Sequence, residues 1–564
     1  MRRHFASGSH LILGLVLVSL LAAASVYRDD LFELRKNFEI FGALYEEIAI
    51  NYVDDVRPQP FMRAGIDAML TQLDPYTQYY DEADMVDMQL MQRRKIGTVG
   101  LNVGLRGGRL TVLAPENNAA AYRQGIRTGD IILQIGETLT DNLTVEEAYD
   151  LLMGQPRTTV DVLVQRGAEM SPRLFVLPRS LPRSQNVSYS GYLGADSTDG
   201  IAYLRLDIFG DRSAREVKRA LRNMDRDGAL HGIVLDLRGN PGGIVGEAVD
   251  IVELFIPKGS VVASTRTRVN DSVQEFKTDE DPLFPEIPLV VLMDRYSASA
   301  SEIVAGALQD YDRAVIIGET SYGKGLVQIT RPLPHNTLLK LTVSHYYLPT
   351  GRTIQSFELN SASARVAIPT LTSFKTFGGR PVRGGAGVEP DRPIAVEATS
   401  EIESVLRQES AYFLFADQWV DKHCESAGSE APNSETPLNP RKVTPSCLEA
   451  DIESFDEFME WLPQSGIKVV TDSDAVLNRL ESEIVAEKYQ VTTELKSLRT
   501  ALESQKRTQL TSLRQVIETH IREEIRARLL SEYDRHVQAV ASDPWIAGAN
   551  QLVRDPAAVR RMLN

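Results

Sequence analysis

Three short runs of apolar residues constrain the fold of this chain more than any other feature. They lie at Gly232–Leu237, Ile287–Met293 and Ala314–Ile317, and each has the length of a buried β-strand. A helix-like segment, Ser301–Asp310, separates the last two. Alternation of apolar strands with helices is typical of an α/β layer architecture. Residues 185–395 are therefore predicted to form an α/β core, and the segment from Ser356 to Ala386 within it a polar surface insertion.

Residues 96–180 have a different pattern, in which short β-type runs are separated by glycines. Gly97–Leu101 and Gly125–Ile132 are two such glycine-containing turns. The runs and one helix-like segment lie at Val99–Leu105, Leu110–Leu113, Ile131–Ile135, Val145–Met153 and Val160–Gln165. This order predicts a small β-barrel with one helix and resembles a PDZ domain. The alternative is a generic β-domain whose glycines only make turns.

A PDZ groove binds a chain end as an added strand, while backbone N–H groups hold the terminal carboxylate. Gly97–Leu101 stands where the PDZ family has its carboxylate-binding loop, and glycine permits the close approach that such a ligand needs. The resemblance therefore implies that Val99, Gly100 and Leu101 bind the C-terminus of a substrate.

Helical regions flank these two domains. In residues 31–94, apolar residues recur at three- and four-residue steps, which predicts a helical cap whose pattern is broken at Leu73–Thr77. Residues 396–564 form a second helical region, since no Gly or Pro occurs from Ile467 to Asp543. Its charged surface and apolar stripes predict a pair of long amphipathic helices. They pack on the chain's own core or form a coiled-coil or dimer arm.

The N-terminal segment predicts export. Arg2 and Arg3 precede an apolar run from Leu11 to Leu21, and small residues and then Asp29 follow. Residues 1–27 are thus a cleaved signal peptide or an uncleaved anchor in the inner membrane. Both alternatives place the rest of the chain in the periplasm.

Composition excludes several classes of protein. The 564 residues include 61 Lys and Arg against 77 Asp and Glu, a net charge of −16, and such a chain lacks the basic stripe that nucleic acids require. Eight scattered histidines and two cysteines argue against zinc and iron–sulfur sites, so neither metal nor cofactor is expected. In an oxidising compartment Cys424 and Cys447 are expected to form a disulfide, and two unpaired thiols are the alternative.

The segment Ser297–Ile303 lies on a predicted turn from strand to helix. Small residues around Ser299 let a substrate carbonyl approach its hydroxyl, and N–H groups at a helix start favour developing negative charge. However, Ser299-x-x-Glu302 is also a capping box, and most serines in that pattern only cap a helix. Both roles remain open from the local pattern.

A serine nucleophile needs a base, and no His-Asp pair or Gly-x-Ser-x-Gly elbow stands out in the chain. Lys324 can serve if burial suppresses its charge, because desolvation lowers the pKa of a lysine. If Gly325–Ile329 is a strand, Lys324 and Gln328 share a face, and Gln328 can orient the amine. A solvated surface lysine is the alternative.

The stretch from Gly318 to Lys324 also resembles a phosphate-binding P-loop. The next residue is Gly325 rather than Ser or Thr, so the hydroxyl that binds magnesium is missing. A β-like run then follows where a P-loop would continue into a helix. A nucleotide-hydrolysing function is therefore rejected.

Several separated motifs follow one another along the chain: Leu73–Thr77, Leu235–Gly243, Ser297–Asp310, Gly318–Gln328, Tyr347–Gln355 and Gly387–Asp391. In this order they resemble the carboxyl-terminal processing, or tail-specific, serine peptidase family, from about residue 35 to 395. The resemblance implies that Ser299 is the nucleophile, Lys324 the general base and Gln328 its orienting partner.

The same resemblance implies an oxyanion hole made by the backbone N–H groups of Gly243 and Ala300, with Gly242 shaping the turn. The expected function is a serine endopeptidase that cleaves exported proteins recognised through their accessible C-termini. An adaptor protein, membrane anchoring and a homo-oligomer are left open. The alternative function is an inactive PDZ scaffold that binds protein tails without cutting them.

Overall fold

The computed structural model describes residues 32–85, 96–116, 119–167, 171–181, 186–193, 199–226, 229–267, 272–359, 365–367, 372–394, 400–424, 454–487, 491–530 and 532–564. They divide into two units, each treated by itself below. The predicted signal or anchor segment 1–27 and Cys447 lie outside the described residues. Within the described ranges, no helix combines the length and the apolar character that a membrane span requires.

The first unit runs to Asp81 and includes the hairpin tip 330–342. Its helices are 32–51 and α2 (Pro58–Leu70), and β1 (Gln78–Tyr80) pairs antiparallel with residues 338–340. The predicted break in the helical pattern is a turn built on Asp74, whose carboxylate accepts hydrogen bonds from the N–H groups of Tyr76 and Thr77. The Thr77 hydroxyl then accepts one from the N–H of Thr342 at 3.2 Å.

The second unit is built around a six-stranded sheet. Only β8 and β9 pair antiparallel; the other neighbours are parallel. The three apolar runs of the sequence become the adjacent strands β10, β13 and β14, which confirms a mixed α/β core. The order is β21 (Arg392–Pro393), β14 (Val315–Gly318), β13 (Leu289–Met293), β10 (Gly232–Asp236), β9 (Ile201–Leu206) and β8 (Val187–Tyr192).

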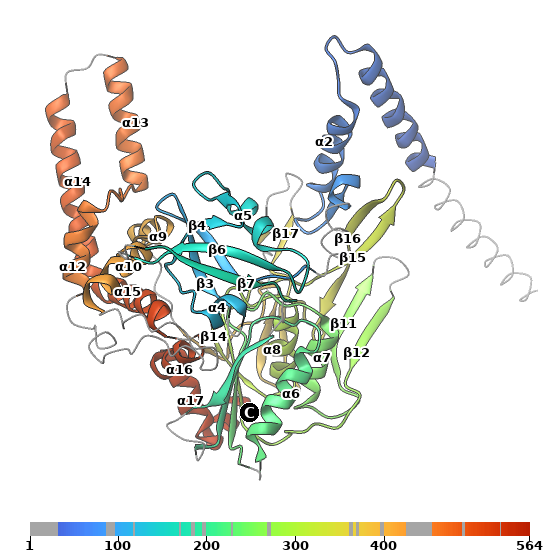
Figure 1. Ribbon diagram of the computed structural model, residues 1–564. Helices are drawn as coiled ribbons and strands as arrows, with labels where there is room; N and C mark the ends of the chain where they lie inside the picture. The colour runs from blue at the N-terminus through green and yellow to red at the C-terminus, as the bar shows by residue number, and fades with distance from the viewer. Residues whose placement is uncertain are drawn as a thin grey trace, which may run out of the picture. The chain divides into compact units, whose positions relative to one another are not determined.

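Both faces of this sheet are buried, because successive side chains alternate between them. Leu235 and Val291 pack on one face against α6 (Ser213–Met224), α7 (Val245–Glu253) and α8 (Ala300–Asp310). Val234 and Val290 pack on the other face against α17 (Pro544–Val553) and α18 (Pro556–Leu563). The last two helices of the chain thus cover one face of the core sheet. Figure 1 marks the C-terminus, where these helices end.

A second, smaller sheet extends the core, where β11 (Val261–Thr267) pairs with β12 (Val273–Lys277) and with residues 344–347 of β16. The hairpin strands are β15 (Leu326–Leu333) and β16 (Thr337–Tyr347). The predicted surface insertion also contains regular structure. It holds β17 (Phe357–Leu359), β18 (Arg365–Ala367) and the antiparallel pair β19 (Thr372–Lys375) and β20 (Pro381–Gly384).

The PDZ region is one sheet with two helices and its own apolar core. Thr98 and Ser180 form an isolated bridge beside the two edge strands. That the PDZ region forms a closed barrel stays a prediction. In the strand order, β2 lies at one edge of the sheet. The strands pair in the order β2 (Leu101–Arg106), β3 (Arg109–Pro115), β4 (Ile131–Ile135), β6 (Thr159–Gln165) and β7 (Arg173–Pro178), with β5 (Thr138–Leu139) on β4, and the helices are α4 (Ala120–Gln124) and α5 (Val145–Leu152).

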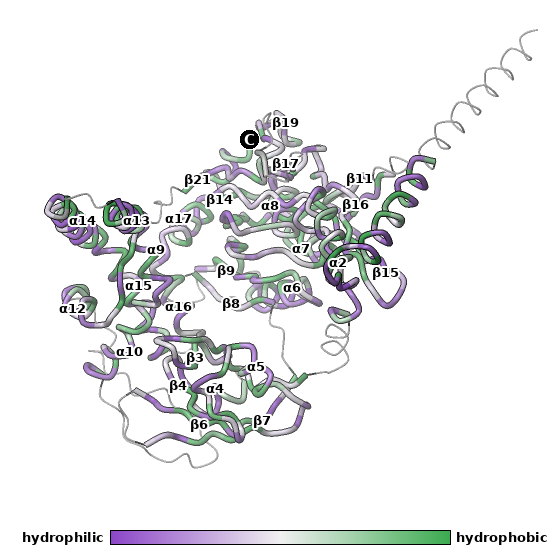
Figure 2. Tube along the Cα trace, turned by 90° about the horizontal axis from the view of Figure 1, so that it is seen from above, coloured by the Kyte–Doolittle hydropathy of each residue, from purple (hydrophilic) through white to green (hydrophobic). Residues whose placement is uncertain are grey.

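The C-terminal region is helical, as expected, but the stretch predicted as two long helices forms four. Among them α13 and α14 lie side by side in both views (Figures 1 and 2). The stripe Ile517, Ile521 and Ile525 is buried in this region's own core. Cys424, after α10, is disulfide-bonded. The helices are α9 (Glu401–Gln408), α10 (Ala411–His423), α12 (Ser454–Trp461), the 3-10 turn η3 (Leu462–Gln464), α13 (Asp472–Ala486), α14 (Thr492–Ser512), α15 (Arg514–Leu529) and α16 (Glu532–Ser542).

Candidate active site

Ser299 lies at the turn between β13 and α8, as the sequence predicts. The turn is fixed to the end of β10, because the Ser297 hydroxyl donates to the carbonyl of Leu237 at 2.9 Å and Asp294 accepts from the N–H of Gly239 at 3.0 Å. Ser299 itself is half-buried and has φ 56° and ψ −111°. Non-glycine residues rarely adopt a positive φ, and such strain gathers at functional sites.

The carboxylate of Glu302, in the first turn of α8, connects Ser299 to the segment that carries Lys324. Its Oε2 accepts hydrogen bonds from the N–H of Ser299 at 2.7 Å and of Lys324 at 2.9 Å. Its Oε1 accepts from the Ser321 hydroxyl at 2.5 Å and from the N–H of Gly323 at 2.7 Å. Burial raises the pKa of Glu302, although these four donors oppose the shift.

Lys324 is half-buried in the loop directly before β15, and Gln328 is the third residue of that strand and also half-buried. The loop is held from its other side as well. The N–H of Gly325 donates to Oε1 of Gln355 at 2.8 Å, and the N–H of Ser356 donates to the carbonyl of Gly323 at 3.1 Å. Two elements distant in sequence therefore fix the backbone on either side of Lys324.

The predicted oxyanion loop lies against the Ser299 turn. The carbonyl of Asn240 accepts from the N–H of Ala298 at 3.0 Å and from the Ser301 hydroxyl at 2.9 Å. Gly242 has φ +99°, and a Cβ added there would lie 2.8 Å from Cβ of Ser299 and 2.9 Å from the nitrogen of Ala300. Only glycine therefore fits this close contact.

The N–H groups of Gly243 and Ala300 have a feature that an oxyanion hole requires. Within the described part of the chain, neither of them donates a hydrogen bond to a protein acceptor. The carbonyl groups of the preceding residues do form hydrogen bonds. The carbonyl of Gly242 accepts from the N–H of Phe209 at 3.0 Å, and the carbonyl of Ser299 accepts from the N–H of Ile303 at 3.0 Å. Two donors are thus left available beside the Ser299 turn.

A buried charge network supports the start of the predicted oxyanion loop. Asp236, at the end of β10, is fully buried and accepts from Arg238 and from the Tyr203 hydroxyl at 2.7 Å. Burial alone would raise the pKa of Asp236, but the guanidinium groups of Arg238 and Arg205 lower it below its usual value. Arg238 also pairs with Asp543, before α17, at 2.7 Å. The C-terminal helices are thereby connected to this loop.

The predicted PDZ residues lie at the start of the edge strand β2. Val99 and Leu101 are buried in the PDZ core, and Gly100 has φ +73°. Next to them, the Tyr149 hydroxyl from α5 accepts from the N–H of Val103 at 3.1 Å and donates to Oδ1 of Asn102 at 2.9 Å. A peptide that bound to this edge as an added strand would need the N–H of Val103 as a hydrogen-bond donor.

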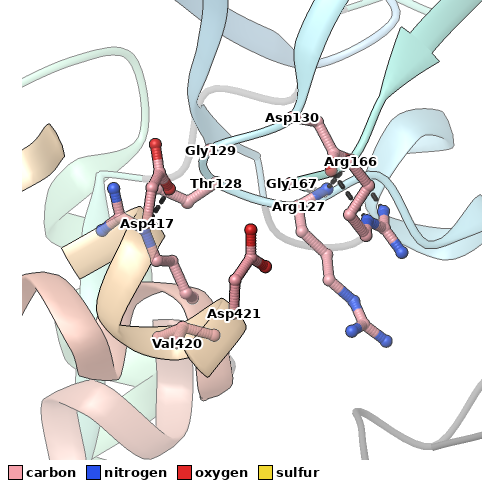
Figure 3. A pocket seen from close by; sticks show the side chains of 10 residues that line it. Arg127, Thr128, Gly129, Asp130, Arg166, Gly167, Asp417, Val420 and Asp421 are labelled. Atoms are coloured by element: carbon pink, nitrogen blue, oxygen red, sulfur yellow. Dashed lines mark hydrogen bonds and ion pairs between the residues drawn. The ribbon is translucent and has the colours of Figure 1, made fainter. Parts of the chain in front are cut away.

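The glycine turn of the PDZ region, Gly125–Ile132, packs against α10, with a small cavity of about 40 Å³ between them. Figure 3 shows the turn from Arg127 to Asp130 facing Asp417 and Asp421 of that helix. Asp417 is held by Arg528 of α15 at 2.6 Å. The turn that identified the PDZ region by its sequence therefore also contacts the C-terminal helical region.

Sequence reasoning missed the part that Glu302 and Asn240 play in this site. It interprets Glu302 only as a helix cap, and it includes Asn240 only within the motif Leu235–Gly243. One signal was present: Glu302 is a charged residue in a helix whose residues are all buried, so its carboxylate needs buried partners. The partners themselves could not be read from the pattern, because three of them lie in the Lys324 segment.

Comparison with known proteins identifies each region. The description "Peptidase family S41" matches residues 200–360, "PDZ domain" matches 111–166, and "Probable PDZ-protease, C-terminal helical domain" matches 402–553. A carboxy-terminal-processing protease of Bartonella bacilliformis is 34% identical over 324 residues, which are 57% of this chain and 73% of that protein. A carboxyl-terminal-processing protease of Synechocystis sp. is 33% identical over 292 residues, 50% of this chain and 66% of that protein.

Among solved structures, the photosystem II D1 C-terminal processing protease aligns with 24% identity over 63% of this chain and 86% of its own, with a TM-score of 0.36. The family matches cover the core, the PDZ region and the helical region in the order that the fold displays. The chain therefore belongs to peptidase family S41, is a protease related to the carboxy-terminal-processing proteases, and carries a PDZ domain.

Proposed function

We propose that this protease is a tail-specific serine endopeptidase that uses Ser299 and Lys324 as a catalytic dyad. The observation that carries the proposal is the shared carboxylate oxygen of Glu302, which holds the backbone of both residues. The strained backbone of Ser299 and the two N–H donors of Gly243 and Ala300 support the same assignment. Together they supply a nucleophile, a base and an anion-stabilising site, which acyl transfer requires.

The proposed reaction begins with a neutral Lys324 amine, which takes the proton of the Ser299 hydroxyl as the oxygen attacks a peptide carbonyl. Gln328 orients the amine. The N–H groups of Gly243 and Ala300 then stabilise the oxyanion, and each such donor contributes about 2.7–4 kcal/mol. The protonated amine gives its proton to the leaving nitrogen, and the amine next activates the water that releases the acyl-enzyme.

Substrate selection is assigned to the PDZ domain. A protein C-terminus would add to β2 as a strand, with its carboxylate at the loop of Val99, Gly100 and Leu101. The basic and apolar start of the chain supports export to the periplasm, either as a cleaved protein or with an inner-membrane anchor. Exported proteins with accessible C-termini are then the substrates, and an adaptor protein or a second copy of the chain are candidate partners.

The proposal is tested by incubating an unstructured protein with the wild-type enzyme, Ser299→Ala and Lys324→Arg. Both variants are expected to lose cleavage while they keep the wild-type unfolding temperature, because arginine stays protonated and cannot act as a base. Lys258→Arg changes an exposed lysine and serves as the control. Wild-type cleavage in either dyad variant would contradict the assignment, and tail binding without fragments from the wild-type protein would identify a scaffold.

A further inference from the structure

A cavity of about 830 Å³ lies where α15, α16 and the start of α17 meet the loop after β10. Four guanidinium groups line this arginine cavity, from Arg522 and Arg526 of α15, Arg535 of α16 and Arg238 of the loop. Its volume falls in the range of pockets that bind small molecules, about 300–1,000 Å³. Figure 1 shows the three helices as consecutive elements of the C-terminal region.

Helical spacing explains why the arginines gather. Arg522 and Arg526 are four residues apart, so they share one face of α15, while Ile521 and Ile525 on another face are buried in the C-terminal core. On α16, Arg535 and other lining residues likewise recur at four- and three-residue steps. Two helices therefore each present one continuous face to the arginine cavity.

The charge of the arginine cavity is opposite to that of the chain. The chain carries a net charge of −16, but the lining side chains that the structure describes include four arginines and two carboxylates, Glu523 and Asp543. Arg238 also pairs with the buried Asp236. Asp543 pairs with Arg238 and also accepts from the N–H of Trp545 at 2.7 Å, at the start of α17. The Glu523 side chain is 67% exposed. A local positive potential of this kind attracts anions.

Burial of the Arg535 Nε favours an anion in the arginine cavity. The Nε atoms of Arg522, Arg526 and Arg535 are all buried. Over the part of the chain that the structure describes, the Nε of Arg535 has no hydrogen-bond partner. A buried charged donor without a partner is destabilising, and a guanidinium group pairs well with the two oxygens of a carboxylate or phosphate.

We infer that the arginine cavity binds a small oxyanion that carries two or more negative charges. Phosphate-bearing and polycarboxylate molecules share this chemistry, because both offer paired oxygens to the planar guanidinium groups. Binding at this site uses none of the residues assigned to catalysis, and it does not depend on the proposed peptidase mechanism.

Isothermal titration calorimetry of the full-length Ser299→Ala variant tests the inference. Pyrophosphate and citrate are the two probes, and sodium chloride at equal ionic strength is the reference. Saturable binding of pyrophosphate alone supports a phosphate-bearing ligand, and binding of citrate alone supports a polycarboxylate. Binding of both supports the shared oxyanion chemistry. Heats that match those of sodium chloride for both probes would overturn the inference.

Two variants locate the binding. Arg535→Gln and Arg526→Gln are each expected to weaken binding at least about tenfold, which is the effect of losing one charge-assisted contact. Arg560→Gln removes an exposed arginine of α18 and is expected to bind as the parent protein does. Thermal unfolding verifies that each variant is folded. Unchanged binding in folded Arg535→Gln and Arg526→Gln would show that the arginine cavity is not the site.

Discussion

The backbone N–H groups of Ser299 and Lys324 donate to the same oxygen atom, Oε2 of Glu302. The two residues are 25 positions apart in the chain, and each belongs to a different loop of the core sheet. One buried carboxylate thus fixes the position of both loops relative to the start of α8. A protease that uses a serine and a lysine needs this relationship, because a small displacement of either side chain costs a large part of the rate.

Glu302→Gln is expected to lower kcat about 10- to 100-fold with little change in KM. The glutamine amide has one oxygen, so it can replace only one of the two carboxylate oxygens as an acceptor. In one orientation its NH2 group would face the N–H groups of Ser299 and Lys324. In the other orientation it would face the Ser321 hydroxyl and the Gly323 N–H. Losing two bonds to a buried carboxylate costs about 1–3 kcal/mol each, part of which appears in the activation barrier. Steady-state kinetics with a fluorogenic peptide measure the effect.

Glu403→Gln provides the control for this variant, because Glu403 is also buried but lies in α9 of the C-terminal region. We expect Glu403→Gln to lower the unfolding temperature and leave kcat unchanged. If the two variants lose kcat to the same extent, Glu302 has no special relation to the proposed dyad. Covalent labelling of Ser299 by a serine-reactive phosphonate gives a second readout, and we expect slower labelling only in Glu302→Gln.

Gly242→Ala is expected to lower kcat more than about 100-fold, because movement of its loop displaces the neighbouring Gly243 N–H, a proposed oxyanion-hole donor. The added methyl group would lie 2.7 Å from the carbonyl oxygen of Ala298 and 2.8 Å from Cβ of Ser299, so the loop must move. Gly351→Ala is the matched control, because Gly351 also has a positive φ, +85°, but nothing lies within 4 Å of the added atom. Equal kinetics in both variants would remove Gly242 from the site.

Tyr149→Phe is expected to strengthen the binding of a C-terminal peptide about 2- to 10-fold. In the free domain the Tyr149 hydroxyl accepts a hydrogen bond from the N–H of Val103. A peptide that binds as an added strand must displace this hydroxyl. Fluorescence anisotropy of a labelled peptide with Ser299→Ala as the parent measures the affinity. Tyr122→Phe, on α4 of the same domain, is the control. Weaker binding by Tyr149→Phe would instead mean that the hydroxyl contacts the ligand.

The sequence predicts those features of this fold that depend on short-range pattern. β10, β13 and α8 are located because burial and helix capping leave a local signature. Ser299 and Lys324 are predicted as site residues because their motifs are short. The packing of α17 on the core sheet was not predicted, since an amphipathic stripe shows that a helix is buried but not against which surface. The end of α14 at Ser512 was missed for a similar reason: no Gly or Pro marks it.

Gly129→Ala is expected to loosen the contact between the PDZ domain and α10. A Cβ at Gly129 would lie 2.3 Å from Oδ1 of Asp417, and that carboxylate cannot simply rotate away because Arg528 holds it. Hydrogen exchange in α10 should rise about tenfold. Gly136→Ala in the same domain tests strain alone, since Gly136 has φ +57° and no atom within 4 Å of an added Cβ. Equal protection of α10 in both variants would contradict the prediction.

Asp236→Asn is expected to destabilise the peptidase core by about 3–5 kcal/mol at pH 7, because it breaks a buried ion pair with Arg238. The pKa of Asp236 is lower in the folded than in the unfolded state, so the stability from its charge is present above the usual pKa of an aspartate. That stability is lost as the pH falls through the folded-state pKa. The difference between the variant and the wild type should therefore shrink at the acidic end of a pH series.

Differential scanning calorimetry from pH 3 to pH 7 measures this difference for the transition of the peptidase core. Asp207→Asn is the control, because Asp207 pairs with Arg205 at 2.9 Å but its side chain is 41% exposed, and exposed pairs contribute about 0–1 kcal/mol. A loss in Asp236→Asn that equals the loss in Asp207→Asn at pH 7 would contradict the prediction. So would a loss that stays constant over the whole pH series, since the stability would then not come from the charge of Asp236.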